Sequence, residues 1–221
     1  MDVYFAQWLT LIIVFTFAVL SPGPDFVIAV RNSLLYSRRV GIMTAFGFGA
    51  GVLLHVTYTL LGIAALIEQS VIIFNSLKWI GALYLIYIGF MALRSRGSAS
   101  KIMAQIEQDG QADPCQTCPS KTLTSWQAFR TGFLTNALNP KASLFFLAIF
   151  SQIINPATPL TWQIAYGLTC SAMVTIWFSL VAVVLNHPPI RNRFLKWSKW
   201  IDRICGGLMV ALGIKIALTS K

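Results

Sequence analysis

Two short motifs place opposite charges beside proline in apolar sequence. The first is Ser21–Asp25, which reads Ser-Pro-Gly-Pro-Asp, and the second is Asn139–Lys141, which reads Asn-Pro-Lys. Proline removes a backbone donor and clashes with the preceding turn, so two prolines around a glycine predict a broken helix. A plain proline kink is the structural alternative. In lipid, the backbone groups freed by a break must face protein, water or ligand.

The carboxylate of Asp25 follows the first motif directly. A carboxylate inside a membrane span costs about 2.5–3.5 kcal/mol on insertion scales, so it usually faces an interior cavity on a substrate or proton path. Asp25 would also lie at the N-terminus of the resumed helix, where the helix dipole favours negative charge. Capping of that helix is therefore an alternative role, and the two roles can coexist.

The ammonium of Lys141 is the counterpart of Asp25 in the second motif, 116 residues further along the chain. Asn139 can cap a helix that restarts at Pro140, since proline suits the first helical position. Two broken helices that meet near the midplane would bring the opposite charges together. A zwitterionic amino acid fits between them, with its ammonium at Asp25 and its carboxylate at Lys141. Alternatively, the two side chains pair only with each other.

The predicted substrate site consists of residues from both motifs and one tryptophan within an apolar segment: Pro22, Gly23, Pro24, Asp25, Asn136, Asn139, Pro140, Lys141 and Trp177. A packing or lipid-facing role is the alternative for Trp177. Gly47, Gly51 and His55 are spaced by four residues and share one helical face. The two glycines favour close helix packing. His55 titrates near neutral pH, so with Asp25 it is a candidate for proton coupling, and a packing histidine is the alternative.

Long apolar segments supply the elements that hold these motifs. Of the 221 residues, 56% are hydrophobic and 11% are charged, whereas soluble domains carry about 25% charged residues. Apolar stretches of about 20 residues cross a bilayer as helices. The sequence therefore predicts an all-α membrane protein with six transmembrane helices, at Val3–Val30, Val40–Ile67, Val71–Leu93, Phe129–Ile154, Leu160–Leu185 and Trp200–Leu218.

The net charge of +10 gathers in alternate loops, those that follow the first, third and fifth predicted spans. This placement explains the charge without nucleic-acid binding. The positive-inside rule puts these loops in the cytoplasm and both termini outside. We therefore expect a multi-pass protein of the bacterial inner membrane, surrounded by lipid. Its small-residue faces are compatible with a homodimer but do not require one.

The polar segment 94–125 divides the chain into residues 1–93 and 126–221, each with three predicted spans. Because three is odd, the second half must enter the membrane from the opposite side. The sequence therefore predicts two inverted three-helix repeats, an architecture common in transporters, with the first and fourth helices broken.

Other function classes fit the residues less well. An intramembrane enzyme needs a nucleophile with a base, or a metal cluster, and the spans hold too few histidines and carboxylates. A thiol–disulfide electron carrier with inverted repeats needs cysteines beside the prolines, where this chain has Asp25 and Lys141. The ammonium of Lys141 also disfavours a metal-cation exporter. Cys115 and Cys118 form half of a zinc-ligand set in the central loop, and their role stays open. We predict no metal and no cofactor.

The motifs resemble those of the LysE/RhtB family of amino-acid exporters over nearly the whole chain. The matching segments are Ser21–Asp25, Gly47–Gly51, Gly81–Leu85 with Gly89, Gly132–Asn136 and Asn139–Lys141. The tail Lys199–Asp202 with Gly206 and Gly207 looks most like the threonine-efflux branch. This resemblance implies efflux of threonine, homoserine or similar amino acids, coupled to the proton-motive force.

Overall fold

The computed structural model describes residues 2–69, 71–95, 97, 99, 101, 103–104, 123–153 and 158–218. All regular structure in these residues is helical, which confirms the predicted all-α class. Cys115 and Cys118 lie outside the described residues, as does most of the segment 94–125. The helices, in chain order, are α1 (Asp2–Leu20), α2 (Pro24–Leu35), α3 (Arg38–Gln69), α4 (Val71–Arg94), α6 (Ser125–Ala137), α7 (Pro140–Ile153), α8 (Leu160–Val184) and α9 (Pro188–Leu218).

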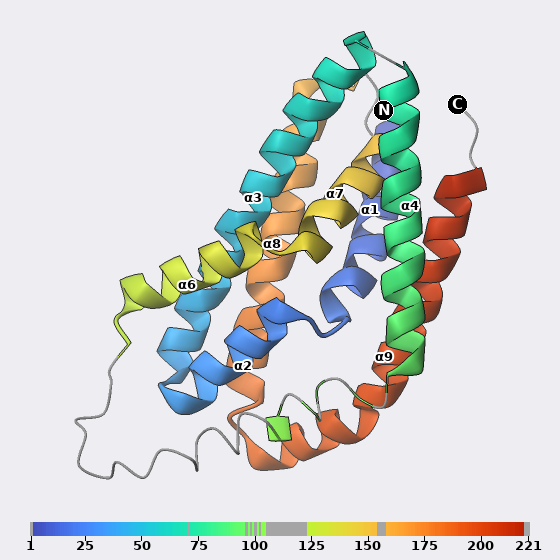
Figure 1. Ribbon diagram of the computed structural model, residues 1–221. Helices are drawn as coiled ribbons and strands as arrows, with labels where there is room; N and C mark the ends of the chain where they lie inside the picture. The colour runs from blue at the N-terminus through green and yellow to red at the C-terminus, as the bar shows by residue number, and fades with distance from the viewer. Residues whose placement is uncertain are drawn as a thin grey trace.

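The helices form an elongated bundle whose two ends differ in charge. Figure 1 shows the start of α1, the end of α3, the start of α4 and the end of α9 at one end. At the other end α3 begins, α4 ends and α9 begins, with Arg38, Arg94 and Arg191. We call this second end the basic end.

The predicted helix breaks are confirmed at both motifs. Helix α1 ends at Leu20 and α2 begins at Pro24, after Gly23 in an extended conformation. Helix α6 ends at Ala137 and α7 begins at Pro140, and the two helices are bent by 55°. Helices α2 and α7 both begin with proline. Proline is tolerated in the first turn, because the backbone N–H groups there make no hydrogen bond within the helix.

Several described helices are long and apolar enough to cross a membrane. Three do so singly, over Val3–Leu20, Arg38–Gly62 and Leu160–Val184, and the bent pair α6–α7 adds a fourth. The chain is therefore a multi-pass membrane protein. The finer count of six spans stays a prediction.

Helix α9 begins much earlier than the predicted sixth span, which was placed at Trp200–Leu218. It starts at Pro188 and includes the basic segment that we expected in a loop. Figure 1 shows its first turns crossing the basic end before the helix turns along the bundle. Phe194 on this part stacks on Phe26 with ring centroids 5.8 Å apart. This segment is an amphipathic helix, since Phe194 and Leu195 pack on the core. The many charges around them hide that pattern in the sequence.

Helices that precede the segment 94–125 pack on helices that follow it. Helix α3 contacts both α6 and α8, α4 contacts α9, α2 contacts α6, and α1 contacts α7. At the crossing of α4 and α9, a Cβ atom added to Gly89 would lie 2.6 Å from the carbonyl oxygen of Gly206. The halves are therefore joined along their whole length by close contacts between helices.

Alanine substitutions at two adjacent glycines of α9 will separate this close packing from helix propensity. A Cβ atom at Gly206 would lie 2.6 Å from Gly89 O and 2.8 Å from Leu93 N, both backbone atoms. At Gly207 the contact is 4.0 Å, to the Cδ2 atom of Leu93. We expect Gly206→Ala to destabilise the protein by about 1–3 kcal/mol, the usual cost of overpacking.

Gly207→Ala is the matched control, and we expect its thermal midpoint to equal or slightly exceed that of the wild type, because alanine favours helix over glycine. Thermal unfolding in detergent measures both variants. Equal midpoints for the two variants would show that α4 and α9 can separate at no cost.

Candidate functional site

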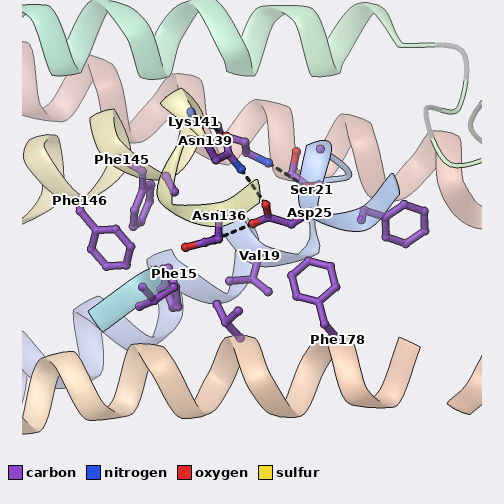
Figure 2. A pocket seen from close by; sticks show the side chains of 16 residues that line it. Phe15, Val19, Ser21, Asp25, Asn136, Asn139, Lys141, Phe145, Phe146 and Phe178 are labelled. Carbon is purple, nitrogen blue, oxygen red and sulfur yellow. Dashed lines mark hydrogen bonds between the residues drawn. The ribbon is translucent and has the colours of Figure 1, made fainter. Parts of the chain in front are cut away.

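The Asp25 carboxylate in the first turn of α2 is held by two asparagines from the second break. Asn136 Nδ2 donates to Asp25 Oδ2 at 2.7 Å, and Asn139 Nδ2 donates to Asp25 Oδ1 at 3.2 Å (Figure 2). Asn136 lies in the last turn of α6, and Asn139 directly precedes α7. The break between α6 and α7 therefore supplies the hydrogen-bond donors for the acid of the other break.

Lys141 completes a reciprocal arrangement. The side chain of Asn139 caps α7, since its Oδ1 accepts a hydrogen bond from the backbone N–H of Lys141 at 3.0 Å. The Lys141 ammonium donates to the backbone oxygen of Ser21 at 2.7 Å. Proline and glycine after Ser21 interrupt the helix there, so this carbonyl has no helical partner. Each break thus satisfies a group exposed by the other.

The two charges share a cavity, yet each bonds to the opposite break rather than to the other charge. We call this space the site cavity, and its volume is about 60 Å³. Its polar lining consists of Ser21, Gly23, Asp25, Asn136, Asn139 and Lys141. Its apolar wall includes Phe15 on α1, Phe145 and Phe146 on α7, and Phe178 on α8 (Figure 2).

Asn136 is buried and has an unused acceptor. Its nitrogen faces the Asp25 carboxylate, which can only accept, so its Oδ1 atom points away. That oxygen has no hydrogen-bond partner among the described residues. A buried acceptor without a partner costs about 1–3 kcal/mol, and this oxygen lies against Gly51 of α3.

The face of α3 that carries Gly47, Gly51 and His55 lies against α6. A Cβ atom at Gly47 would lie 2.2 Å from Phe129 O, and one at Gly51 would lie 2.7 Å from Asn136 Oδ1. His55 Nε2 donates to the backbone oxygen of Asn136 at 2.8 Å, and its Nδ1 bonds to the hydroxyl of Tyr58. This face of α3 therefore packs against Asn136. Among the described residues, His55 is connected to Asp25 by hydrogen bonds only through Asn136.

The prolines Pro22, Pro24 and Pro140 line a second cavity of about 320 Å³, beside the site cavity. Sequence reasoning missed its other polar residues, among them Tyr84, Tyr87 and Asp202. The structure does not bring Trp177 to the breaks. It places Trp177 in a separate apolar cavity with Thr16, Val19, Leu20, Met173, Ile176 and Leu180, between α1 and α8.

The remaining cysteines and acidic groups form no metal centre in the described part of the chain. There, no group of three or more His, Cys, Asp or Glu side chains is placed to hold a metal ion. Cys170 and Cys205 are buried and carry free thiols. The charged and polar groups at the breaks offer binding through charge and hydrogen bonds.

Comparison with known proteins identifies the family. The family model described as "LysE type translocator" matches residues 16–220. The chain is 30% identical to the threonine efflux protein of Salmonella typhi, over 95% of this chain and 97% of that protein. It is 29% identical to the threonine efflux protein of Escherichia coli strain K12, over 96% and 98% respectively.

It is also 25% identical to the homoserine/homoserine lactone efflux protein of Salmonella typhimurium, over 96% of this chain and 97% of that protein. No solved structure matches the chain significantly. The family match covers most of the chain, including both breaks and every residue that lines the second cavity. The chain therefore belongs to the LysE type translocators, a family of membrane transport proteins and not of enzymes.

Proposed function

We propose that this protein exports amino acids such as threonine or homoserine from the cytoplasm, in exchange for protons. It would act in the bacterial inner membrane, with six spans arranged as two inverted three-helix repeats. The family and the full-length similarity to threonine and homoserine efflux proteins support the substrate class. The helix breaks at both proline motifs and the contacts of α3 with α8 and of α4 with α9 support the repeat arrangement.

One observation carries the proposal. A partly buried carboxylate and a partly buried ammonium, those of Asp25 and Lys141, line one small cavity, and neither is bonded to the other. An α-amino acid carries one group of each sign on adjacent atoms. Its ammonium would bind the Asp25 carboxylate, and its carboxylate would bind Lys141. Such charge-assisted hydrogen bonds are about twice as strong as neutral ones.

The same carboxylate can couple transport to protons. A charged carboxylate in a span needs a partner, because the bilayer interior does not solvate it. When the substrate ammonium leaves Asp25, a proton can replace it and neutralise the carboxylate. Occupation of Asp25 by either an ammonium or a proton, but not both, gives antiport. His55 adjusts this exchange through Asn136. Its ring bonds to the backbone oxygen of Asn136, and the side chain of Asn136 bonds to Asp25.

Counterflow in proteoliposomes tests the function. The purified protein is reconstituted with an unlabelled amino acid inside, and uptake of a panel of labelled amino acids is followed with and without an imposed pH gradient. We expect exchange of threonine or homoserine, and net transport that follows the proton gradient. A folded protein that moves no amino acid in the panel would refute the proposal.

The proposed orientation has its own test in intact cells. Cys115 and Cys118 lie in the central loop, which the charge distribution assigns to the cytoplasm. A membrane-impermeant thiol reagent added outside should therefore leave both residues unmodified until the cells are opened. Labelling in intact cells would reverse the orientation without affecting the substrate proposal.

A further inference from the structure

The second cavity lies between the two breaks and the helices α4 and α9. Its α4 wall is formed by Tyr84, Tyr87, Ile88 and Met91, in the half of the helix that leads to the basic end. Its volume of about 320 Å³ compares with about 60 Å³ for the site cavity. We call it the basic-end cavity. In this conformation the roomier space lies on the side of the breaks that faces the basic end.

A buried carboxylate lines the basic-end cavity. Asp202 on α9 is 1% exposed. Its Oδ2 atom accepts a hydrogen bond from Ser95 Oγ at 2.6 Å, and Ser95 Oγ accepts from the N–H of Gly97 at 3.1 Å. Asp202 is therefore hydrogen-bonded to the segment that follows α4, and its residue lines the cavity.

Lys141 lines both cavities, as do Ser21, Gly23 and Asn139. The basic-end cavity thus has the same pair of charges as the site cavity, with Asp202 in place of Asp25. The two carboxylates lie on different elements, α9 and α2, and a single ammonium, that of Lys141 on α7, serves both spaces. Tyr84 and Tyr87 add aromatic surface and hydroxyl groups beside the larger cavity.

We propose that the basic-end cavity is a first subsite for the zwitterionic amino acid, which binds with its ammonium at Asp202 and its carboxylate at Lys141. The substrate then passes the breaks by exchanging Asp202 for Asp25, while its carboxylate stays with Lys141. The inference rests on the proposed function and adds a second acidic residue to it. Transfer between two carboxylates around one fixed ammonium keeps both substrate charges partnered throughout.

A pair of variants separates the charge of Asp202 from its hydrogen bond to Ser95. Asp202→Asn keeps an oxygen that accepts from Ser95 but removes the charge. Ser95→Ala removes the bond and keeps the charge, so it is the matched control. Concentration-dependent uptake is measured in inverted membrane vesicles, where substrate reaches the basic end first, and in right-side-out vesicles. Elution and thermal midpoint in detergent check that both variants are folded.

For Asp202→Asn we expect at least a roughly tenfold rise in KM from the basic end, because a charge-assisted hydrogen bond to the ammonium is lost. From the opposite face, KM should stay within about twofold of wild type. Ser95→Ala should keep the wild-type KM on both faces. An unchanged KM for Asp202→Asn, or the same rise in Ser95→Ala, would overturn the subsite.

The two proposals fail in different ways. If the wild-type protein transports amino acids and Asp25→Asn does not, but Asp202→Asn behaves as wild type on both faces, only the subsite is refuted. If the wild-type protein transports no amino acid, the proposed function is refuted together with the subsite that rests on it.

Discussion

Replacing Asp25 with Asn will reduce amino-acid transport at least about 100-fold while the protein stays folded. The substituted amide fills the same volume and can still accept a hydrogen bond from one of the two asparagines that hold Asp25. It cannot neutralise the substrate ammonium or exchange it for a proton. Loss of one or two charge-assisted bonds, each about 1.5–3 kcal/mol, accounts for this factor. Counterflow in proteoliposomes measures it.

Asp25→Glu is the control for charge, because it keeps a carboxylate in the same cavity, and we expect it to retain measurable exchange. Size-exclusion elution and the thermal midpoint check the fold of both variants. Wild-type transport by a folded Asp25→Asn variant would leave Asp25 with a capping role alone.

Replacing Lys141 with Met will also abolish transport, and by a different route. The variant removes the charge that would bind the substrate carboxylate in both cavities. It also leaves the Ser21 carbonyl without its donor. We therefore expect a loss of transport of at least about 100-fold and a loss of stability of about 1–3 kcal/mol, the cost of an unpaired buried carbonyl. Counterflow and thermal unfolding give the two readouts.

The double variant Asp25→Asn/Lys141→Met decides what the two charges do. If they served only to balance each other, removing both would restore transport that either single change abolishes. If each binds one end of the substrate, the double variant will be as inactive as the single ones. We expect the second result, because in the structure each side chain bonds to the opposite break.

The helix breaks and the cap at α7 could be predicted because their causes are local. Proline lacks a donor wherever it stands, so Pro22, Pro24 and Pro140 mark the helix ends without knowledge of the fold. The Asn139 side chain likewise caps α7 by accepting a hydrogen bond from the backbone N–H of Lys141, two residues further along the chain. The hydrogen bonds between the two breaks could not be predicted from local sequence. That the Lys141 ammonium meets the Ser21 carbonyl depends on how two distant segments pack.

The misplaced Trp177 and the missed Asp202 have a common physical origin. Helix α8 is apolar on every side, so its sequence does not show which face meets the breaks. Packing turns Trp177 toward α1 instead. Asp202 falls at the start of the predicted sixth span, directly after a run of basic residues, and no local pattern assigned it a role. Its burial depends on how α9 packs in the bundle.

The contacts of α3 with α8 and of α4 with α9 have a consequence for how the protein is made. Synthesis proceeds from the N-terminus, and membrane helices form before they associate. Within the described residues α3 and α4, though consecutive, contact each other far less than they contact α8 and α9. The first half must therefore wait in the bilayer with surfaces such as that of Gly89 covered only by lipid. Assembly is completed when α9 emerges, so a ribosome-bound first half is an unassembled intermediate.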